Sequence, residues 1–291
     1  MSYTIEKGVE PLKFIIFSDL DDTLLDHDTY KWEKAGPALE HCSNFNVPVI
    51  LVSSKTSAEI RIIHEEMGLD FPFVSENGGG IFFPMGYKED LMDEDFSISK
   101  GLAKLTLGKA YEELLFCLKA IGEETGLHLK GFSQMTHAEV MKLTGLTEEQ
   151  CNLALMREFD EPFIIQGPAD ADTRLLYASA EKRGLKISEG GRFYHLHGDS
   201  DKGRAVKWLT AFFKKQYGPV FSIALGDSPN DFAMFDVVNQ PVMVKSSERL
   251  SDLNIKERYP GILVTDKNGP EGWNKAVMGL LRTEREVLSD V

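Results

Sequence analysis

The chain has 291 residues, of which 42% are hydrophobic and 27% charged, so it has the composition of a globular protein and enough length for two domains. Its 32 basic and 46 acidic side chains give a formal net charge of −14, which argues against nucleic acid or an anionic membrane as a partner. Apolar runs stay well short of about 18 residues and the three cysteines are scattered. We therefore expect a cytoplasmic protein with reduced thiols and no obligate protein partner.

The first predicted element is a buried strand over residues 14–17, an unbroken apolar run that Asp19 and Asp21 follow closely. Open parallel sheets bind their ligands at the carboxyl ends of the strands. Two carboxylates separated by one residue suit phosphoryl transfer. One can attack phosphorus, while the other protonates the leaving oxygen and then deprotonates water.

The next elements alternate between strands and helices, as they do in a doubly wound α/β sheet. A strand over residues 47–52 leads into Ser53, and residues 55–67 are predicted to form a helix. A short strand over residues 71–74 is followed by three consecutive glycines and by the apolar residues 81–83, a pattern that suggests a hairpin.

We expect residues 87–192 to form a second domain inserted into the first. The stretch from Gly86 to Phe96 is acidic and has no periodicity, as a crossing between domains would. The insert itself contains both helical and strand patterns. Helices are predicted over residues 107–121, 151–159 and 171–183, with a capping-box sequence at 147–150, and strands over residues 163–165 and 185–187.

The alternating residues 193–197 are expected to return the chain to the first domain. The remaining predicted elements are helices over residues 201–217, 229–238 and 270–281, and strands over residues 221–225, 241–244 and 261–264. The sequence therefore predicts an α/β fold. Residues 1–86 and 193–291 would form a doubly wound, mainly parallel Rossmann-like sheet, and residues 87–192 an α/β cap domain.

Four polar motifs follow one another along the chain, each after a predicted strand or at the start of a helix. They are the acid pair at Asp19 and Asp21, the hydroxyl of Ser53, the lysine of Asp201-Lys202-Gly203, and the acidic stretch that begins at Asp227. In this order the chain resembles the haloacid dehalogenase-like phosphohydrolases along most of its length. The resemblance implies that Asp19 is the nucleophile and a metal ligand, and that Asp21 is the general acid and base, with its main-chain carbonyl facing the metal.

The same resemblance implies roles for the other motifs. Ser53 would donate a hydrogen bond to a phosphoryl oxygen, and Lys202 would neutralise both the oxyanion and the Asp19 carboxylate. Asp227 would be the third protein contact to the metal, with Asn230 and Asp231 completing the acidic shell. Oxygen ligands without a His or Cys cluster favour Mg²⁺ as the cofactor. Taken singly, Ser53 and Lys202 would more often be a helix cap and a surface lysine.

One position departs from the family pattern, because Asp22 stands where the family usually has glycine. If that position needs a positive φ, aspartate tolerates it better than most residues do.

Within this superfamily the chain is most similar to mannosyl-3-phosphoglycerate phosphatases. The resemblance is carried by six stretches in both predicted domains, at residues 17–21, 53–56, 75–79, 157–163, 191–195 and 269–273. It implies a small phosphorylated sugar-acid substrate that carries a phosphate and a carboxylate. A second anion site is then needed for the carboxylate. Arginine side chains are candidates for it, because a guanidinium group can pair with a carboxylate through two hydrogen bonds.

Several residues are candidates for contacts to this substrate. Arg157 could instead pair with Glu158, Asp160 or Glu161 on its own surface, and either His195 or His197 could face the cleft. The candidates for substrate binding are Ser54, Lys55, Asn77, Arg157, Arg174, Arg192, His195 and Asn230.

Three other functions remain open from the sequence. The chain could be another sugar phosphatase, or a phosphotransferase like the phosphomannomutases, which share this core and a similar cap. It could also be a non-catalytic sugar-phosphate sensor, although the intact motifs disfavour this.

Overall fold

The computed structural model describes residues 12–87, 95–99, 101–167, 173–190, 192–246 and 255–289. Contacts divide the chain into two compact units, residues 1–51 with 206–291 and residues 52–205. Most of the acidic stretch predicted to cross between domains lies outside the described residues, as do the start of the helix predicted at Ala171 and Gly191 of the resemblance. None of the described helices has both the length and the apolar character that crossing a membrane requires.

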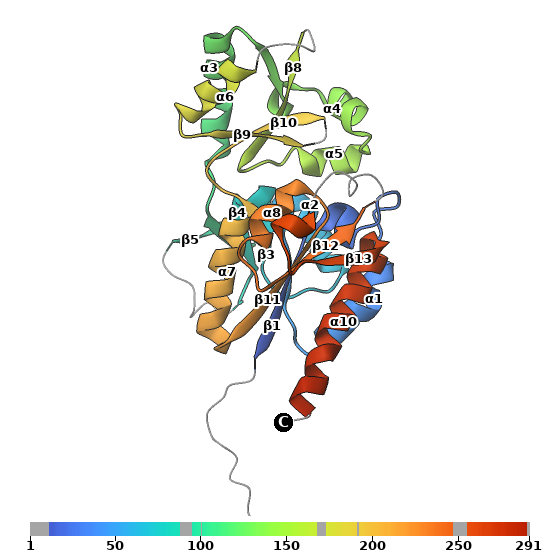
Figure 1. Ribbon diagram of the computed structural model, residues 1–291. Coiled ribbons are helices and arrows are strands. Elements are labelled where there is room, and N and C mark those ends of the chain that lie inside the picture. Colours follow the sequence, from blue (N-terminus) through green and yellow to red (C-terminus); the bar gives the residue numbers. More distant parts are fainter. Residues whose placement is uncertain are drawn as a thin grey trace, which may run out of the picture. The chain divides into compact units, whose positions relative to one another are not determined.

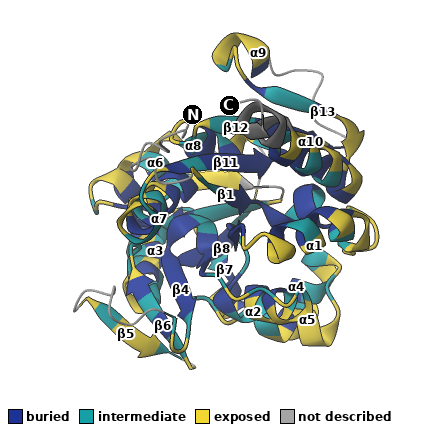
Figure 2. Ribbon diagram, turned by 90° about the horizontal axis from the view of Figure 1, so that it is seen from below, coloured by how far each residue is buried: buried dark blue, intermediate teal, exposed yellow. Residues whose placement is uncertain are grey.

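The first unit is built on a five-stranded parallel sheet with the order β13-β12-β11-β1-β2 (Figure 1). The two central strands are almost completely buried, as their apolar sequences predict (Figure 2). The strands are β1 (Lys13–Ser18), β2 (Val49–Leu51), β11 (Val220–Gly226), β12 (Gln240–Lys245) and β13 (Leu263–Asn268). The predicted parallel α/β sheet is therefore confirmed.

Helices cover both faces of this sheet. Helix α10 packs against α1, β13 and β12, and its buried Trp273 donates a hydrogen bond from Nε1 to Oγ of Ser18 at 2.9 Å. Helix α7 runs along the opposite face (Figure 1). The helices are α1 (Gly36–Asn44), α7 (Lys202–Tyr217), α8 (Phe232–Phe235), α9 (Ile255–Arg258) and α10 (Gly269–Ser289), where α7 has its first turn in the second unit.

The second unit contains two antiparallel sheets. The first has the order β3-β4-β6-β5 and includes the predicted hairpin, in which Ser75 pairs with Gly80. Helix α2 (Ser57–Glu66) precedes it and begins with a capping box formed by Thr56 and Glu59. The strands are β3 (Phe73–Ser75), β4 (Gly80–Pro84), β5 (Phe96–Ser99) and β6 (Leu102–Thr106).

The second sheet has the order β7-β8-β10-β9 and is covered on both faces. Phe163 and Leu196 pack with α3 and α6, whereas Ile164 and Phe193 pack with the residues of α4 and α5. This follows from the strand period of two. The elements are α3 (Tyr111–Thr125), β7 (His128–Gly131), α4 (His137–Thr144), α5 (Glu148–Ala154), β8 (Asp160–Gln166), α6 (Arg174–Glu181), β9 (Lys186–Gly190) and β10 (Phe193–His197).

The expectation for residues 193–197 was wrong. We expected this strand to return the chain to the first domain, but β10 is an inner strand of the second unit's sheet and pairs with both β8 and β9. The alternation of its residues buries Leu196 against α3 and α6, and two neighbours satisfy its backbone. Apart from these five residues, the division into a core of residues 1–86 and 193–291 and a cap of residues 87–192 stays a prediction.

Candidate active site

In the first unit, three buried carboxylates gather at the carboxyl ends of the two central strands. Asp19 follows β1, Asp227 follows β11, and the Asp19 N–H donates to the carbonyl of Leu225 at 2.9 Å. Asp19, Asp227 and Asp231 each offer a carboxylate oxygen, and these oxygens lie within 4.8 Å of one another. All three side chains are buried. The sequence thus correctly predicts that the first and last acidic motifs meet.

The backbone after β11 fixes the position of the third carboxylate. Oδ2 of Asp231 accepts hydrogen bonds from the N–H groups of Asp227 at 3.0 Å and of Ser228 at 3.1 Å. A Cβ atom at Gly226 would lie 2.3 Å from Cγ of Asp231, so the carboxylate occupies the space that a larger residue would need. Glycine at position 226 therefore allows Asp231 to reach the cluster.

This cluster has the composition of a site for a hard divalent cation. Its donors are all carboxylate oxygens, which Mg²⁺ prefers over nitrogen or sulfur. Three carboxylates in a buried setting would repel one another if all were ionised, and a divalent cation would offset that repulsion. The residues present therefore fit a bound Mg²⁺.

The turn after Asp19 explains the departure from the family pattern at position 22. Asp22 has φ 58° and ψ 1°, in the left-handed region, whereas Asp21 is extended with φ −67° and ψ 132°. Aspartate is one of the few non-glycine residues that visit this region at modest cost. In addition, Oδ1 of Asp22 lies 2.6 Å from Nδ1 of His27, which holds the side chain to one side of the turn. The positive φ considered from the sequence is confirmed.

In the second unit, the hydroxyl and lysine motifs are brought together by a strained turn. Ser53 and Lys202 are both buried, and the Asn77 N–H donates to the Ser53 carbonyl at 2.9 Å. The next residue, Gly78, has φ 97°, and a Cβ atom there would lie 2.1 Å from the carbonyl oxygen of Asp201. The turn at Asn77 and Gly78 therefore lies against both Ser53 and the residue before Lys202.

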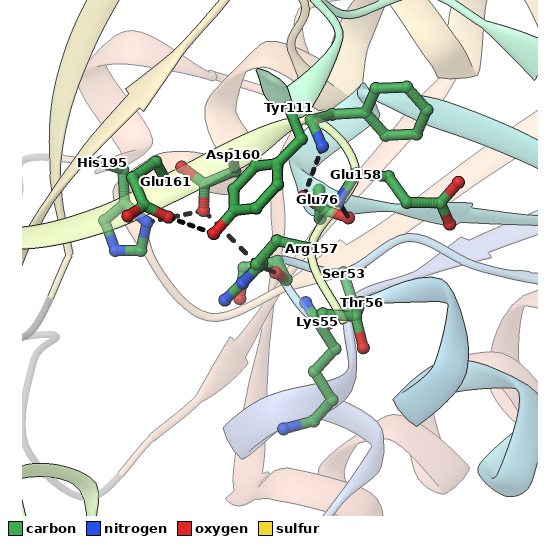
Figure 3. A network of polar contacts seen from close by, with 12 residues as sticks. Ser53, Lys55, Thr56, Glu76, Tyr111, Arg157, Glu158, Asp160, Glu161 and His195 are labelled. Carbon is green, nitrogen blue, oxygen red and sulfur yellow. Dashed lines mark hydrogen bonds and ion pairs between the residues drawn. The ribbon is translucent and has the colours of Figure 1, made fainter. Parts of the chain in front are cut away.

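The neighbours of Ser53 lie in the same turn. The Lys55 N–H donates to Oγ of Ser53 at 3.2 Å, and the Ser54 carbonyl accepts a hydrogen bond from Nη1 of Arg157 at 3.0 Å. Asn77 has φ 51°, in the left-handed region. These contacts bring Ser53, Ser54, Lys55, Asn77 and Arg157 together within the second unit. Figure 3 shows Ser53, Lys55 and Arg157 of this group.

The three candidate arginines lie in different settings. The Arg157 side chain is only 8% exposed and lies 3.5 Å from Oδ2 of Asp160, one of the pairings considered from the sequence. Arg174, the first residue of α6, is exposed. Arg192 is also exposed, and its Nη1 donates to the carbonyl of Leu143 at 2.7 Å.

The remaining candidates for substrate binding, His195 and Asn230, are in separate units. Nδ1 of His195 lies 2.8 Å from Oδ2 of Asp160 on the same sheet (Figure 3). His197 points its Nδ1 to the Gly198 carbonyl at 2.8 Å. Asn230 belongs to the first unit, where it is exposed and accepts a hydrogen bond from Oγ of Ser228 at 2.7 Å.

Sequence reasoning missed the buried acids of the second unit. Glu76, Asp160 and Glu161 are all buried, and Glu161 accepts hydrogen bonds from the Tyr111 hydroxyl and from Ser133. Burial raises the pKa of Glu76 to about 7, although the nearby Arg157 acts in the opposite direction. The signal in the sequence for these buried acids was the set of acidic residues between Glu158 and Glu161, directly after Arg157. It was interpreted as part of the solvent-exposed surface.

The chain resembles known phosphatases along nearly its whole length. A haloacid dehalogenase-like hydrolase model matches residues 16–148. A glucosyl-3-phosphoglycerate/mannosyl-3-phosphoglycerate phosphatase of Persephonella marina is 38% identical over 270 residues, which cover 92% of this chain and 97% of that protein. The chain belongs to the haloacid dehalogenase-like hydrolases. A protein of the same name from Methanococcoides burtonii is 36% identical over 275 residues, covering 93% and 98% of the two chains.

Solved structures support the same family fold. A Thermoplasma acidophilum protein has a TM-score of 0.63 at 21% identity, covering 92% of this chain and 98% of that one. The sucrose-phosphatase of a Synechocystis species has a TM-score of 0.57 at 15% identity, with the same coverage. The expected enzyme class, a phosphoric monoester hydrolase of this family, is thereby confirmed. Phosphatases of this family generally use a divalent metal ion.

Proposed function

We propose that this enzyme is a Mg²⁺-dependent phosphatase that hydrolyses the phosphate monoester of mannosyl-3-phosphoglycerate or a close glycosyl-phosphoglycerate. The observation that carries the chemistry is the buried cluster of Asp19, Asp227 and Asp231 at the ends of β1 and β11. The names of the two relatives, each similar over more than nine-tenths of this chain, support the choice of substrate.

In the proposed reaction Asp19 is the nucleophile and Asp21 is the general acid and base. A carboxylate oxygen of Asp19 attacks phosphorus and forms an aspartyl-phosphate, while Asp21 gives its proton to the leaving glycerate oxygen. Asp21 then takes a proton from the water that hydrolyses the aspartyl-phosphate, which restores both carboxyl groups. Asp19, Asp227 and Asp231, with the main-chain carbonyl of Asp21, would hold Mg²⁺. When bound, this ion would neutralise charge on the phosphoryl oxygens.

Ser53 and Lys202 are proposed to bind the phosphoryl group during the reaction. The negative charge on that group spreads over its equatorial oxygens, so well-placed donors contribute most of the catalysis. The burial of both side chains supports this, because donors shielded from water interact more strongly with a charged group. The chain's net charge of −14 makes such local cations more necessary, because it repels an anionic substrate at long range.

We propose that an arginine binds the carboxylate of the substrate. Arg174 and Arg192 are exposed, whereas the Arg157 side chain is only 8% exposed, so the first two are the stronger candidates for the carboxylate. Ser54, Lys55, Asn77, His195 and Asn230 remain proposed contacts to the rest of the substrate.

A phosphate-release screen with Mg²⁺ tests the proposal. The panel should contain mannosyl- and glucosyl-3-phosphoglycerate, hexose and disaccharide phosphates, and p-nitrophenyl phosphate. The proposal expects kcat/KM to be highest for a glycosyl-phosphoglycerate. A preference for a sugar phosphate without a carboxylate would overturn it in favour of another sugar phosphatase. An isomerised product formed with a bisphosphate activator would indicate a mutase, and no turnover of any ester a sensor.

A further inference from the structure

The turn that carries Ser53 is held by three consecutive carbonyl groups. The Ser53 carbonyl accepts from the Asn77 N–H at 2.9 Å, the Ser54 carbonyl from Nη1 of Arg157 at 3.0 Å, and the Lys55 carbonyl from the Glu76 N–H at 3.0 Å. None of these donors is a neighbour in the sequence. The backbone that carries the Ser53 hydroxyl is thus held by donors from two distant segments, residues 76–77 and Arg157.

The two donor segments are themselves connected through a buried carboxylate. The Glu76 side chain accepts hydrogen bonds from the N–H groups of Glu158, at 3.0 and 3.2 Å, and of Phe159, at 2.8 Å. These amides follow Arg157 directly. The contacts therefore close a ring that runs through Ser54, Lys55, Glu76, Glu158 and Arg157. Figure 3 labels the last four of these residues.

The backbone at Glu76 has a conformation that few residues other than glycine adopt. Glu76 has φ 47°, Asn77 has φ 51° and Gly78 has φ 97°, so three successive residues lie in the left-handed region. A glutamate there is unusual, and such residues cluster at functional sites because the surrounding contacts must hold them. Here one of the contacts that hold Glu76, from its N–H to the Lys55 carbonyl, also holds the Ser53 turn.

One nitrogen of Arg157 contacts both Ser54 and Asp160. Nη1 donates to the Ser54 carbonyl at 3.0 Å and lies 3.5 Å from Oδ2 of Asp160. Asp160 in turn lies 2.8 Å from Nδ1 of His195. The Arg157 side chain is only 8% exposed, which leaves little of it open to a substrate carboxylate.

We propose that Arg157 and Glu76 are positioning residues that hold the Ser53–Lys55 turn, so that the Ser53 hydroxyl is fixed for the phosphoryl group of any ester. This deepens the proposed function, because it rests on Ser53 binding the phosphoryl group. It also removes Arg157 from the residues that choose the leaving group.

A comparison of two substrates tests the proposal. Arg157→Ala should lower kcat/KM by about 10- to 150-fold, the range for losing a hydrogen bond to a charged group. The loss should be equal for p-nitrophenyl phosphate and for the glycosyl-phosphoglycerate, because both use Ser53. A loss confined to the glycosyl-phosphoglycerate would overturn the proposal and make Arg157 a ligand of the carboxylate.

A double-mutant cycle separates positioning from simple stabilisation. If Arg157 acts through Ser53, the variant Ser53→Ala with Arg157→Ala should be no slower than Ser53→Ala alone, within about threefold. Multiplying losses would contradict the proposal. Arg183→Ala is the matched control, since Arg183 also donates to a main-chain carbonyl, that of Ser179 at 2.9 Å, and pairs with Glu124. It should leave both activities unchanged.

Arg157→Ala could fail to fold, because it removes a cation that lies close to the buried carboxyl groups of Asp160 and Glu76. Arg157→Lys keeps that charge but loses the fork, so it should fold, as thermal melting will show, and still lose about tenfold on both substrates. Wild-type activity in Arg157→Lys would overturn the proposal. The comparison on p-nitrophenyl phosphate remains valid if the glycosyl-phosphoglycerate is not the substrate. If the wild type hydrolyses neither ester, the affinity for inorganic phosphate, measured by calorimetry, replaces turnover with the same expected order of variants.

Discussion

Oδ2 of Asp231 lies 3.0 Å from the main-chain nitrogen of Asp227, and this contact holds two members of the carboxylate cluster in a fixed relation. Gly226 leaves the space in which the contact forms. Gly226→Ala should therefore displace Asp231 and weaken Mg²⁺ binding as well as folding. We expect the Mg²⁺ concentration for half-maximal phosphate release to rise at least about tenfold, because moving one charged ligand costs more than about 1.4 kcal/mol.

Gly36→Ala is the control for this experiment. No atom lies within 4 Å of a Cβ at Gly36, so this change should alter neither Mg²⁺ dependence nor activity. An unchanged Mg²⁺ dependence in Gly226→Ala would show that Asp231 is not part of the metal site.

The buried Glu76 predicts a specific dependence of stability on pH. Its pKa is raised from 4.5 to about 7, chiefly by burial, with Arg157 and Asp160 acting in opposite directions. A raised carboxyl pKa means that the folded state binds a proton more tightly than the unfolded state. The resulting stabilisation is fully present below pH 4.5 and is lost as the pH rises through 7.

The free energy of unfolding of the wild type, relative to Glu76→Gln, should therefore fall by about 3 kcal/mol between pH 4.5 and pH 7.5. Denaturant unfolding at several pH values measures this difference. Glu112→Gln, at an exposed position of α3, controls for the loss of one negative charge. A difference that does not vary with pH would mean that Glu76 keeps its charge throughout.

The two exposed arginines can be separated by their effect on the carboxylated substrate. If Arg174 or Arg192 binds the glycerate carboxylate, its replacement by Ala should lower kcat/KM for the glycosyl-phosphoglycerate by about 10- to 150-fold. Turnover of p-nitrophenyl phosphate should stay within about twofold, because that ester has no carboxylate. If both variants keep the wild-type ratio of kcat/KM between the two substrates, neither Arg174 nor Arg192 binds the carboxylate.

Much of the site was predictable because its motifs obey local rules. Asp19 and Asp227 each follow an apolar strand, and parallel strands bring their carboxyl ends to one edge, so their proximity follows from the pattern. The left-handed turn at Asp22 could be anticipated only because the resemblance supplied a glycine at that position.

The buried network of the second unit could not be predicted in the same way. Glu76 and Arg157 are 81 positions apart, and charged residues are normally exposed, so an acidic run after an arginine suggests a solvated surface. Only the tertiary fold shows that their partners are backbone groups, which leave no trace in the sequence. The assignment of residues 193–197 failed for a related reason, since alternation predicts a strand but does not name the sheet that it joins.

The central claim is that the phosphoryl group of an ester passes to Asp19. The most direct test incubates Asp21→Asn enzyme with Mg²⁺ and p-nitrophenyl phosphate, whose leaving group departs without a general acid, quenches it in acid and locates the phosphoryl group by mass spectrometry. Without its base, water should attack the aspartyl-phosphate slowly, so we predict phosphate on the peptide that contains Asp19, and none when Asp19→Asn is added to the variant. Rapid phosphate release by Asp21→Asn without a phosphorylated Asp19 would contradict the account.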